Sequence, residues 1–239
     1  MNTRNQWASK LGFIMATAGA AIGLGNLWKF PYLMGRNGGF PFLVAYLAFI
    51  VILGLPVMMT EMSLGRKTRH DPVQAYADID PHARIVGIFG TLAAFIILSY
   101  YSVIGGWIFK DIISYGTTLA APADFTAFIS TEEPVIWHFV FMAITTAICF
   151  FGISGIEKAS KFMMPLLFML LLIIIVRSVT LPGASEGLKF IFSPEGSGFS
   201  LSSVSAALGQ VFYSLSLCMG ITITYGSYLS DKENIPRSC

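Results

Sequence analysis

The residues that decide the fold lie inside an apolar run that covers residues 11–34, and they read Ala18-Gly19-Ala20-Ala21-Ile22-Gly23-Leu24-Gly25-Asn26. Each glycine in a helix interior costs about 1 kcal/mol relative to alanine, so this stretch weakens the helix at its middle. Two interpretations stay open. Small residues four apart, such as Gly19 and Gly23, allow helices to pack closely in a membrane. Alternatively the helix is broken here, and its free carbonyls coordinate a cation while the amides of the second half attract a carboxylate.

The composition of the whole chain is that of a membrane protein. Of its 239 residues 55% are hydrophobic and 12% are charged, against about 25% charged residues in soluble domains. The net charge of +2 gives no support to nucleic-acid binding. Three scattered cysteines predict neither a disulfide framework nor a zinc site, and no grouping of nucleophile, base and orienting residue predicts an enzyme.

Apolar runs of about 20 residues, long enough to cross a bilayer, occur six times. They cover residues 11–34, 40–64, 85–116, 135–151, 162–181 and 201–229. Basic residues gather between spans two and three and between spans four and five: Arg66, Lys67, Arg69, Arg84, Lys158 and Lys161. The positive-inside rule places these segments in the cytoplasm. We therefore expect an all-α integral membrane protein, multi-pass in the plasma (inner) membrane, with both termini cytoplasmic and the lipid bilayer as its surroundings.

The sixth run contains a second unusual stretch, Ser214-Leu215-Ser216-Leu217-Cys218-Met219-Gly220. Hydroxyl groups in lipid are tolerated when they bond to their own helix, so an ordinary polar helix face is one interpretation. The other is a second break. Two interrupted spans in corresponding places of two repeats are the best sequence indication of a transporter site.

Several longer motifs resemble those of the neurotransmitter:sodium symporter family. The first-helix signature is matched by Trp7-Ala8-Ser9-Lys10-Leu11-Gly12, Gly23-Leu24-Gly25-Asn26-Leu27-Trp28-Lys29-Phe30-Pro31-Tyr32 and Asn37-Gly38-Gly39. Later motifs follow in the family's order: Glu61-Met62-Ser63-Leu64-Gly65-Arg66, Tyr100-Tyr101 with Trp107, Gly155-Ile156-Glu157-Lys158 and Gln210-Val211-Phe212-Tyr213-Ser214-Leu215-Ser216-Leu217. The resemblance implies the leucine-transporter fold, with one five-span repeat, the first helix of the second, and helices 1 and 6 broken at mid-membrane. It also implies sodium-coupled symport of an amino acid or amine by alternating access.

The resemblance implies two sodium sites by position. The Ala21 carbonyl, the Asn26 side chain and Ser214 would serve the first, and the carbonyls of Gly19 and Ile22 would serve the second. Oxygen ligands suit a hard cation such as sodium. Chloride stays open, because Tyr46, Gln210 and Ser214 resemble chloride-site positions while the deciding residue of the family is not in this chain.

The substrate site is implied in the same way. Its expected residues are Ala20, Gly23, Leu24, Gly25, Ile97, Tyr101, Tyr213, Ser214, Ser216 and Met219. The substrate carboxylate would meet sodium, the amides around Leu24 and Gly25, and the Tyr101 hydroxyl. Amine carriers of the family resemble one another in an aspartate where this chain has Gly23, so we expect a zwitterionic neutral amino acid, and the mainly apolar wall favours one of medium to large size.

The implied outer gate consists of Lys29, Tyr101 and Tyr213. Lys29 stands where the family usually has an arginine, so bidentate pairing across the gate is lost. Glu61 allows two interpretations: it braces the break of span six or carries a proton, or it is a helix-end carboxylate at the membrane interface.

The family continues for about as many residues again beyond position 239. Those residues would complete both sodium sites, the substrate wall and the gate, and would cover the broken backbone. We therefore expect a partner for this chain, such as a separately encoded C-terminal half. The alternative function is a non-transporting half-transporter or membrane subunit. The short segment 117–134 favours a prokaryotic member.

Overall fold

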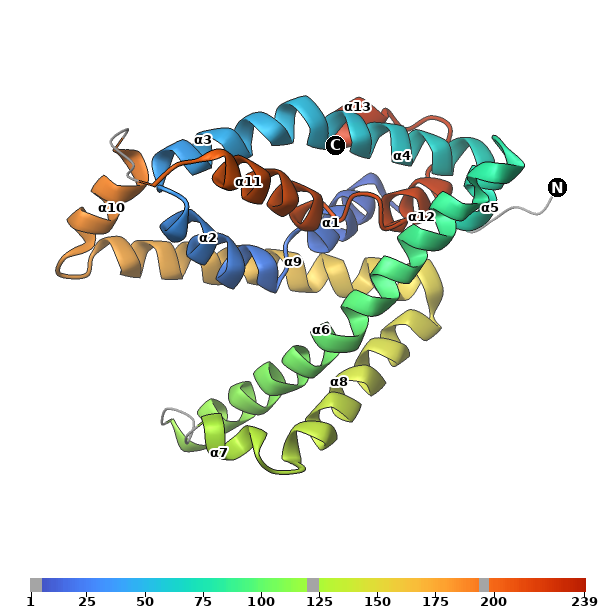
Figure 1. The fold of residues 1–239 in the computed structure, drawn as a ribbon. Helices are drawn as coiled ribbons and strands as arrows, with labels where there is room; N and C mark the ends of the chain where they lie inside the picture. The colour runs from blue at the N-terminus through green and yellow to red at the C-terminus, as the bar shows by residue number, and fades with distance from the viewer. Residues whose placement is uncertain (1–5, 120–124, 194–197) are drawn as a thin grey trace.

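Every regular element of the computed structural model is helical within the residues that it describes, which are 6–119, 125–193 and 198–239 (Figure 1). Part of the short segment 117–134, residues 120–124, lies outside them. The elements in chain order are α1 (Lys10–Ala21), η1 (Gly25–Lys29), α2 (Phe30–Arg36), α3 (Phe40–Phe49), η2 (Ile50–Gly54), α4 (Leu55–Thr68), α5 (Pro72–Ala77), η3 (Pro81–Ala83), α6 (Arg84–Thr118), α7 (Phe125–Ile129), α8 (Glu133–Phe150), α9 (Gly152–Val179), α10 (Ala184–Phe192), α11 (Leu201–Ser214), α12 (Ile221–Ser227) and α13 (Ile235–Ser238).

Four helical stretches among the described residues are long and apolar enough to cross a membrane. They are Phe40–Thr68, Pro81–Thr118, Glu133–Phe150 and Gly152–Val179. The pair Lys10–Ala21 and Gly25–Arg36 counts as a fifth if it is one span, with a bend of 52° at its break. The expected sixth span is divided between α11 and α12, each too short to cross alone, so the six-span count stays a prediction.

The helix that contains the fifth expected span begins earlier than the hydropathy alone indicates. The expected span starts at residue 162, whereas α9 starts at Gly152, directly after α8. The first turns of α9 are polar, and an ion pair of 2.6 Å between Glu157 and Lys161, four residues apart, supports the helix there. Because α8 ends at Phe150 and α9 begins at Gly152, Phe151 alone connects the two helices in a tight turn.

The helices form two groups that diverge from one end of the molecule. Figure 1 shows α3 and α4 as one long helix with α11, α12 and α1 beneath it, while α6 and α8 pack side by side and extend away as an arm. The η2 turn joins α3 to α4 just before Pro56, whose missing N–H interrupts the ordinary helix ladder.

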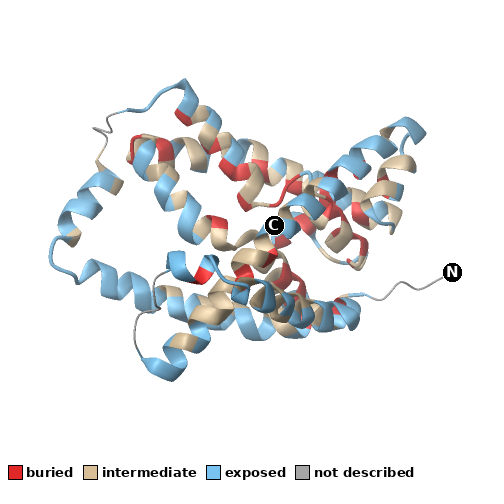
Figure 2. Cartoon of the chain, turned by 60° about the horizontal axis from the view of Figure 1, so that its bottom comes forward, coloured by how far each residue is buried: buried red, intermediate tan, exposed pale blue. Residues whose placement is uncertain are grey.

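The hydrophobic core lies where α1, α4 and α12 meet the end of the chain. It contains Phe13, Met58, Met62, Leu217, Leu229 and Ile235. Figure 2 shows the buried residues gathered in the middle of the molecule near the C-terminus, whereas the outer helices are mostly exposed. Helix α8 has no buried residue, and large apolar side chains such as Phe139 and Phe168 are exposed along α8 and α9. Such apolar faces fit contact with lipid.

Candidate functional site

Two chain interruptions lie at the centre of the candidate site. Helix α1 ends at Ala21 and the chain turns helical again at Gly25, while α11 ends at Ser214 and α12 starts at Ile221. In the second interruption Ser216 and Cys218 have φ angles of 52° and 62°, a left-handed conformation that costs a non-glycine residue roughly 1–3 kcal/mol. Such backbone persists only where the surrounding structure holds it.

Glu61 holds the second interruption from α4. Its side chain is buried, and its carboxylate accepts hydrogen bonds from the Cys218 N–H at 2.9 Å and from the Thr222 hydroxyl. The interpretation of Glu61 as an exposed interface carboxylate is therefore wrong, and the residue braces the chain between α11 and α12.

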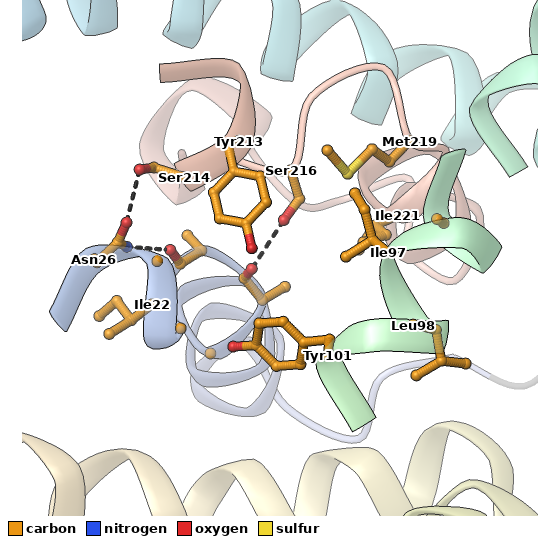
Figure 3. A pocket seen from close by; sticks show the side chains of 16 residues that line it. Ile22, Asn26, Ile97, Leu98, Tyr101, Tyr213, Ser214, Ser216, Met219 and Ile221 are labelled. Carbon is orange, nitrogen blue, oxygen red and sulfur yellow. Dashed lines mark hydrogen bonds between the residues drawn. The ribbon is translucent and has the colours of Figure 1, made fainter. Parts of the chain in front are cut away.

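The two interruptions and helix α6 line an open cavity of about 310 Å³ (Figure 3). Its lining residues are Gly19, Ala20, Ala21, Ile22, Gly23, Gly25, Asn26, Ala94, Ile97, Leu98, Tyr101, Tyr213, Ser214, Ser216, Met219 and Ile221. This set contains every residue expected for the substrate and sodium sites except Leu24, which contributes only its backbone N–H nearby.

The lining also includes three residues that the sequence analysis does not name. Ala94 and Leu98 lie on the same face of α6 as Ile97 and Tyr101, at helical spacings of three and four, so periodicity extended from Tyr101 would have found them. The third is Ile221, the first residue of α12. All three are apolar and enlarge the apolar wall.

Oxygen atoms from both interruptions form a chain of hydrogen bonds at one side of the cavity. The Asn26 side-chain amide donates to the Ala21 carbonyl at 2.6 Å, and the Ser214 hydroxyl donates to Asn26 Oδ1 at 2.6 Å (Figure 3). Buried Gln210 donates to Ser214 Oγ at 3.0 Å. The described residues contain no group of three or more His, Cys, Asp or Glu side chains placed to hold a metal ion. A cation in this cavity would therefore meet neutral oxygens, which suits a hard ion of low charge.

A second group of donors lies where the chain becomes helical again. The Leu24 N–H donates to the Tyr101 hydroxyl at 2.9 Å. A Cβ at Gly23 would lie 2.7 Å from that hydroxyl oxygen, so a larger residue would push Tyr101 away. The helical stretch Gly25–Arg36 begins beside this hydrogen bond, and the positive end of a helix favours an anionic group such as a carboxylate.

Tyr213 and Lys29 lie together beside the cavity. The Lys29 ammonium is 4.8 Å from the centroid of the Tyr213 ring, within the range of a cation–π contact. The ring packs so closely on Gly25 that a Cβ there would lie 2.9 Å from Tyr213 Cδ1. Of the three expected gate residues, Tyr101 and Tyr213 line the cavity and Lys29 does not.

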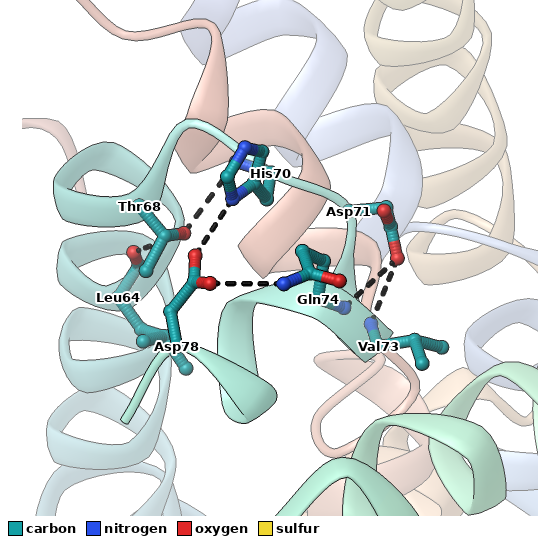
Figure 4. A network of polar contacts seen from close by, with 7 residues as sticks. All are labelled: Leu64, Thr68, His70, Asp71, Val73, Gln74 and Asp78. Atoms are coloured by element: carbon teal, nitrogen blue, oxygen red, sulfur yellow. Dashed lines mark hydrogen bonds and ion pairs between the residues drawn. The ribbon is translucent and has the colours of Figure 1, made fainter. Parts of the chain in front are cut away.

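A separate polar cluster lies in the connection between α4 and α6 (Figure 4). His70 Nδ1 is 2.7 Å from Asp78 Oδ2, and the Gln74 side chain donates to Asp78 Oδ1 at 3.0 Å. Asp71 accepts from the N–H groups of Val73 and Gln74 and so caps α5. The hydrogen bonds from Gln74 and then His70 hold the pKa of Asp78 below its ordinary value.

Comparisons with known proteins show which family and which solved structure the chain is similar to. The profile of the "Sodium:neurotransmitter symporter family" matches residues 4–123 and 126–239. An "Uncharacterized sodium-dependent transporter YhdH" of Bacillus subtilis (strain 168) is 41% identical over 98% of this chain and 54% of its own length. An "Uncharacterized sodium-dependent transporter" of Haemophilus influenzae is 36% identical over 97% of this chain and 55% of its own. The crystal structure of MhsT in complex with L-phenylalanine aligns with a TM-score of 0.90 at 42% identity, over 98% of this chain and 56% of that one. The chain thus spans about half the length of the relatives it matches.

Proposed function

Because the chain belongs to the sodium:neurotransmitter symporter family, we propose that it serves sodium-coupled symport of a neutral amino acid by alternating access. The observation that carries the proposal is the meeting of two groups in one cavity. Neutral oxygens beside both chain interruptions line the same cavity as the Tyr101 hydroxyl, which bonds the Leu24 N–H at the start of a helix, and these two groups suit a carboxylate. Local helix breaks of this kind let backbone groups bind ions and substrate within a membrane.

For the first sodium ion we propose the Ala21 carbonyl, Asn26 Oδ1 and Ser214 Oγ as ligands. The Asn26 side chain bonds both the Ala21 carbonyl and the Ser214 hydroxyl at 2.6 Å, and this proximity supports a shared ion. Sodium would replace the Asn26 to Ala21 hydrogen bond by contacts to both oxygens. For a second ion we propose the carbonyls of Gly19 and Ile22, two residues that also line the cavity.

For the substrate carboxylate we propose the amides of Leu24 and Gly25 and the Tyr101 hydroxyl. The Leu24 N–H and the Tyr101 hydroxyl bond to each other in the structure, so both lie close enough to bind one carboxylate oxygen. Among the described residues, those that line the cavity include no acidic side chain, so they offer no partner to a substrate with a positive charge alone. A zwitterionic amino acid supplies its own carboxylate, and a sodium ion beside it would balance that charge.

For the substrate side chain we propose the wall formed by α6 and the end of the second interruption. Ala94, Ile97, Leu98, Met219 and Ile221 make this wall apolar. The cavity of about 310 Å³ is wide enough for a medium to large neutral side chain, and Met219 can adapt to its shape. L-phenylalanine, the ligand named for the similar MhsT structure, is therefore a suitable first probe.

In the membrane, we propose that both interrupted helices are broken spans, which gives six crossings in a prokaryotic inner membrane with both termini in the cytoplasm. The apolar outer faces of α8 and α9 and the basic residues between the spans support this topology. Chloride dependence stays a prediction.

The test measures ligand-dependent stability of the purified chain in detergent. We expect L-phenylalanine at about 100 times its Kd to stabilise the chain by roughly 2.7 kcal/mol in sodium buffer and much less in potassium buffer. Asn26→Ala should abolish the sodium effect. Asn37→Ala is the matched control, because the Asn37 side-chain amide donates to the Leu33 carbonyl at 2.8 Å, outside this cavity. Equal stabilisation in both buffers would refute the proposal.

One observation favours a second candidate function. The chain covers 56% of the solved relative, so helices outside it would complete the cation and substrate sites. On this hypothesis the chain is half of a transporter and binds a complementary set of helices. It predicts no ligand effect on the chain alone and a sodium-dependent effect once the matching helices of a full-length relative are added.

A further inference from the structure

A buried carboxylate on α9 binds the start of α1. Glu157 is 3% exposed, and its oxygens accept hydrogen bonds from the Ala8 N–H at 2.8 Å and the Ser9 hydroxyl at 2.9 Å. Lys161, one turn along α9, donates to the same carboxylate at 2.6 Å. Hydrogen bonds to a charged, buried group are roughly twice as strong as neutral ones. The start of α1 is therefore bound to α9 by a strong and specific contact.

The same residues form the N-terminal cap of α1. The Ser9 hydroxyl accepts from the Gly12 N–H at 3.0 Å while it donates to Glu157. A Cβ at Gly12 would collide with the Glu157 carboxylate, so only glycine allows the carboxylate to approach so closely. Capping of α1 and its attachment to α9 depend on one network, which we call the Glu157 latch (Glu157, Ala8, Ser9 and Lys161).

Trp7, the residue before the latch, contacts helix α12. The Trp7 indole N–H donates to the Tyr225 carbonyl of α12 at 3.1 Å, and the two rings pack edge to face at 5.4 Å. The start of α1 is thus held by α9 on one side and by α12 on the other. Both neighbours are distant in sequence, which makes this a tertiary contact and not a local cap.

The opposite end of α1 carries the cavity. Gly19, Ala20 and Ala21 line it, and the helix breaks directly afterwards. The 13 residues from Ser9 to Ile22 span about 20 Å at 1.5 Å per residue, so a rotation of 10° about the break moves Ser9 by roughly 3 Å. Such a movement would lengthen the 2.9 Å distance between the Ser9 hydroxyl and Glu157 well beyond the hydrogen-bond limit of about 3.2 Å. Helix α1 therefore cannot swing about its break unless the latch opens first.

Resting on the proposed transport function, we propose that Glu157 is a positioning residue for transport: its latch holds α1 against α9, keeps the inner side of the cavity closed, and must open before α1 swings away. The residue acts through α1 and touches neither ion nor substrate. Its role explains why a charged residue is buried in a helix whose other faces are largely apolar and exposed.

The first test is hydrogen exchange on the purified full chain without sodium or amino acid, so its result does not depend on whether the transport proposal is correct. Glu157→Gln keeps the side-chain shape and removes the charge. We expect the amides of Ala8 and Gly12 to exchange about tenfold faster, with unchanged exchange in α4 and α12. Lys158→Gln is the matched control, because Lys158 is the exposed neighbour on the same helix. Ser9→Ala should show the same faster exchange. Ser9→Thr, which retains the hydroxyl, should exchange at the rate of the parent.

The second test distinguishes a swing of α1 from fraying of its first turn. Spin labels at the exposed positions Leu11 and Phe162, in a chain without its native cysteines, report the distance between α1 and α9. In Glu157→Gln we expect a second, longer distance population that is absent in the parent and in Lys158→Gln. Unchanged exchange, faster exchange in all helices, or an unchanged distance distribution would each overturn the proposal.

Discussion

Replacement of Gly65 by alanine tests the close packing of α4 on α12, which supports the second chain interruption. An ideal Cβ at position 65 would lie 2.8 Å from the Ile223 carbonyl carbon and 2.9 Å from the Ser227 nitrogen, and it would collide with the Ile223 carbonyl oxygen. All three atoms are backbone, so no side chain can rotate to make room. The helices would have to separate by about 1 Å to restore van der Waals contact.

The magnitude follows from two opposing effects. Overpacking costs typically 1–3 kcal/mol, and the rigid backbone places Gly65→Ala near the upper end, about 3 kcal/mol. The alanine also gains about 1 kcal/mol of helix propensity. We therefore expect a net loss of about 2 kcal/mol, which lowers the Tm of a chain of this length by roughly 4–8 °C.

The matched control is Gly209→Ala in α11, where a Cβ would have nothing within 4 Å. Only the helix propensity changes there, so we expect a gain of about 1 kcal/mol and a Tm higher by roughly 2–4 °C. Circular dichroism of the purified variants in one detergent, heated at the same rate, measures both shifts. A Gly65→Ala variant as stable as the parent, or shifted in the same direction as Gly209→Ala, would refute the reasoning.

Three further predictions concern single side chains. Glu61→Leu removes the acceptor of two buried hydrogen bonds at the break before α12, so the free energy of unfolding in detergent should fall by about 2–4 kcal/mol. The control is the exposed Glu186→Leu. A smaller loss in Glu61→Leu than in this control would contradict the bracing role. Gln74 first and then His70 hold the pKa of Asp78 below its ordinary value of 3.8, so its contribution to stability is present above that pH and is lost as the pH falls through the lower folded value. The Tm should therefore fall less steeply below pH 4 in Asp78→Asn than in the parent, and identical pH profiles would exclude the contribution. If the proposed function holds, Tyr101→Phe should weaken amino-acid binding about tenfold in a thermal-shift titration, because the lost hydroxyl would bond the substrate carboxylate. Loss of the acceptor of the Leu24 N–H should also lower the Tm without ligand by roughly 2–4 °C. Unchanged affinity would remove Tyr101 from the site.

Local properties of the sequence indicate the class and family of this protein. Runs of apolar side chains predict helices in a membrane because the transfer free energy of each side chain from water to lipid depends on that side chain and not on distant residues. Glycines between residues 18 and 26 lower helix propensity where α1 ends at Ala21. The resemblance to the sodium:neurotransmitter symporter family is confirmed by the family profile over nearly the whole chain. The resemblance also named most of the residues that line the cavity.

The tertiary structure decided how those residues are used. Sequence alone left Glu61 open between a brace and an interface residue, and it missed Ile221, whose place at the cavity depends on how α12 starts after a break. It also gave no sign that Glu157 binds Ser9, 148 positions away. The physical reason is that apolar periodicity is short-range, whereas a buried carboxylate takes its role from whichever donors the packing of distant helices brings within 3 Å of it.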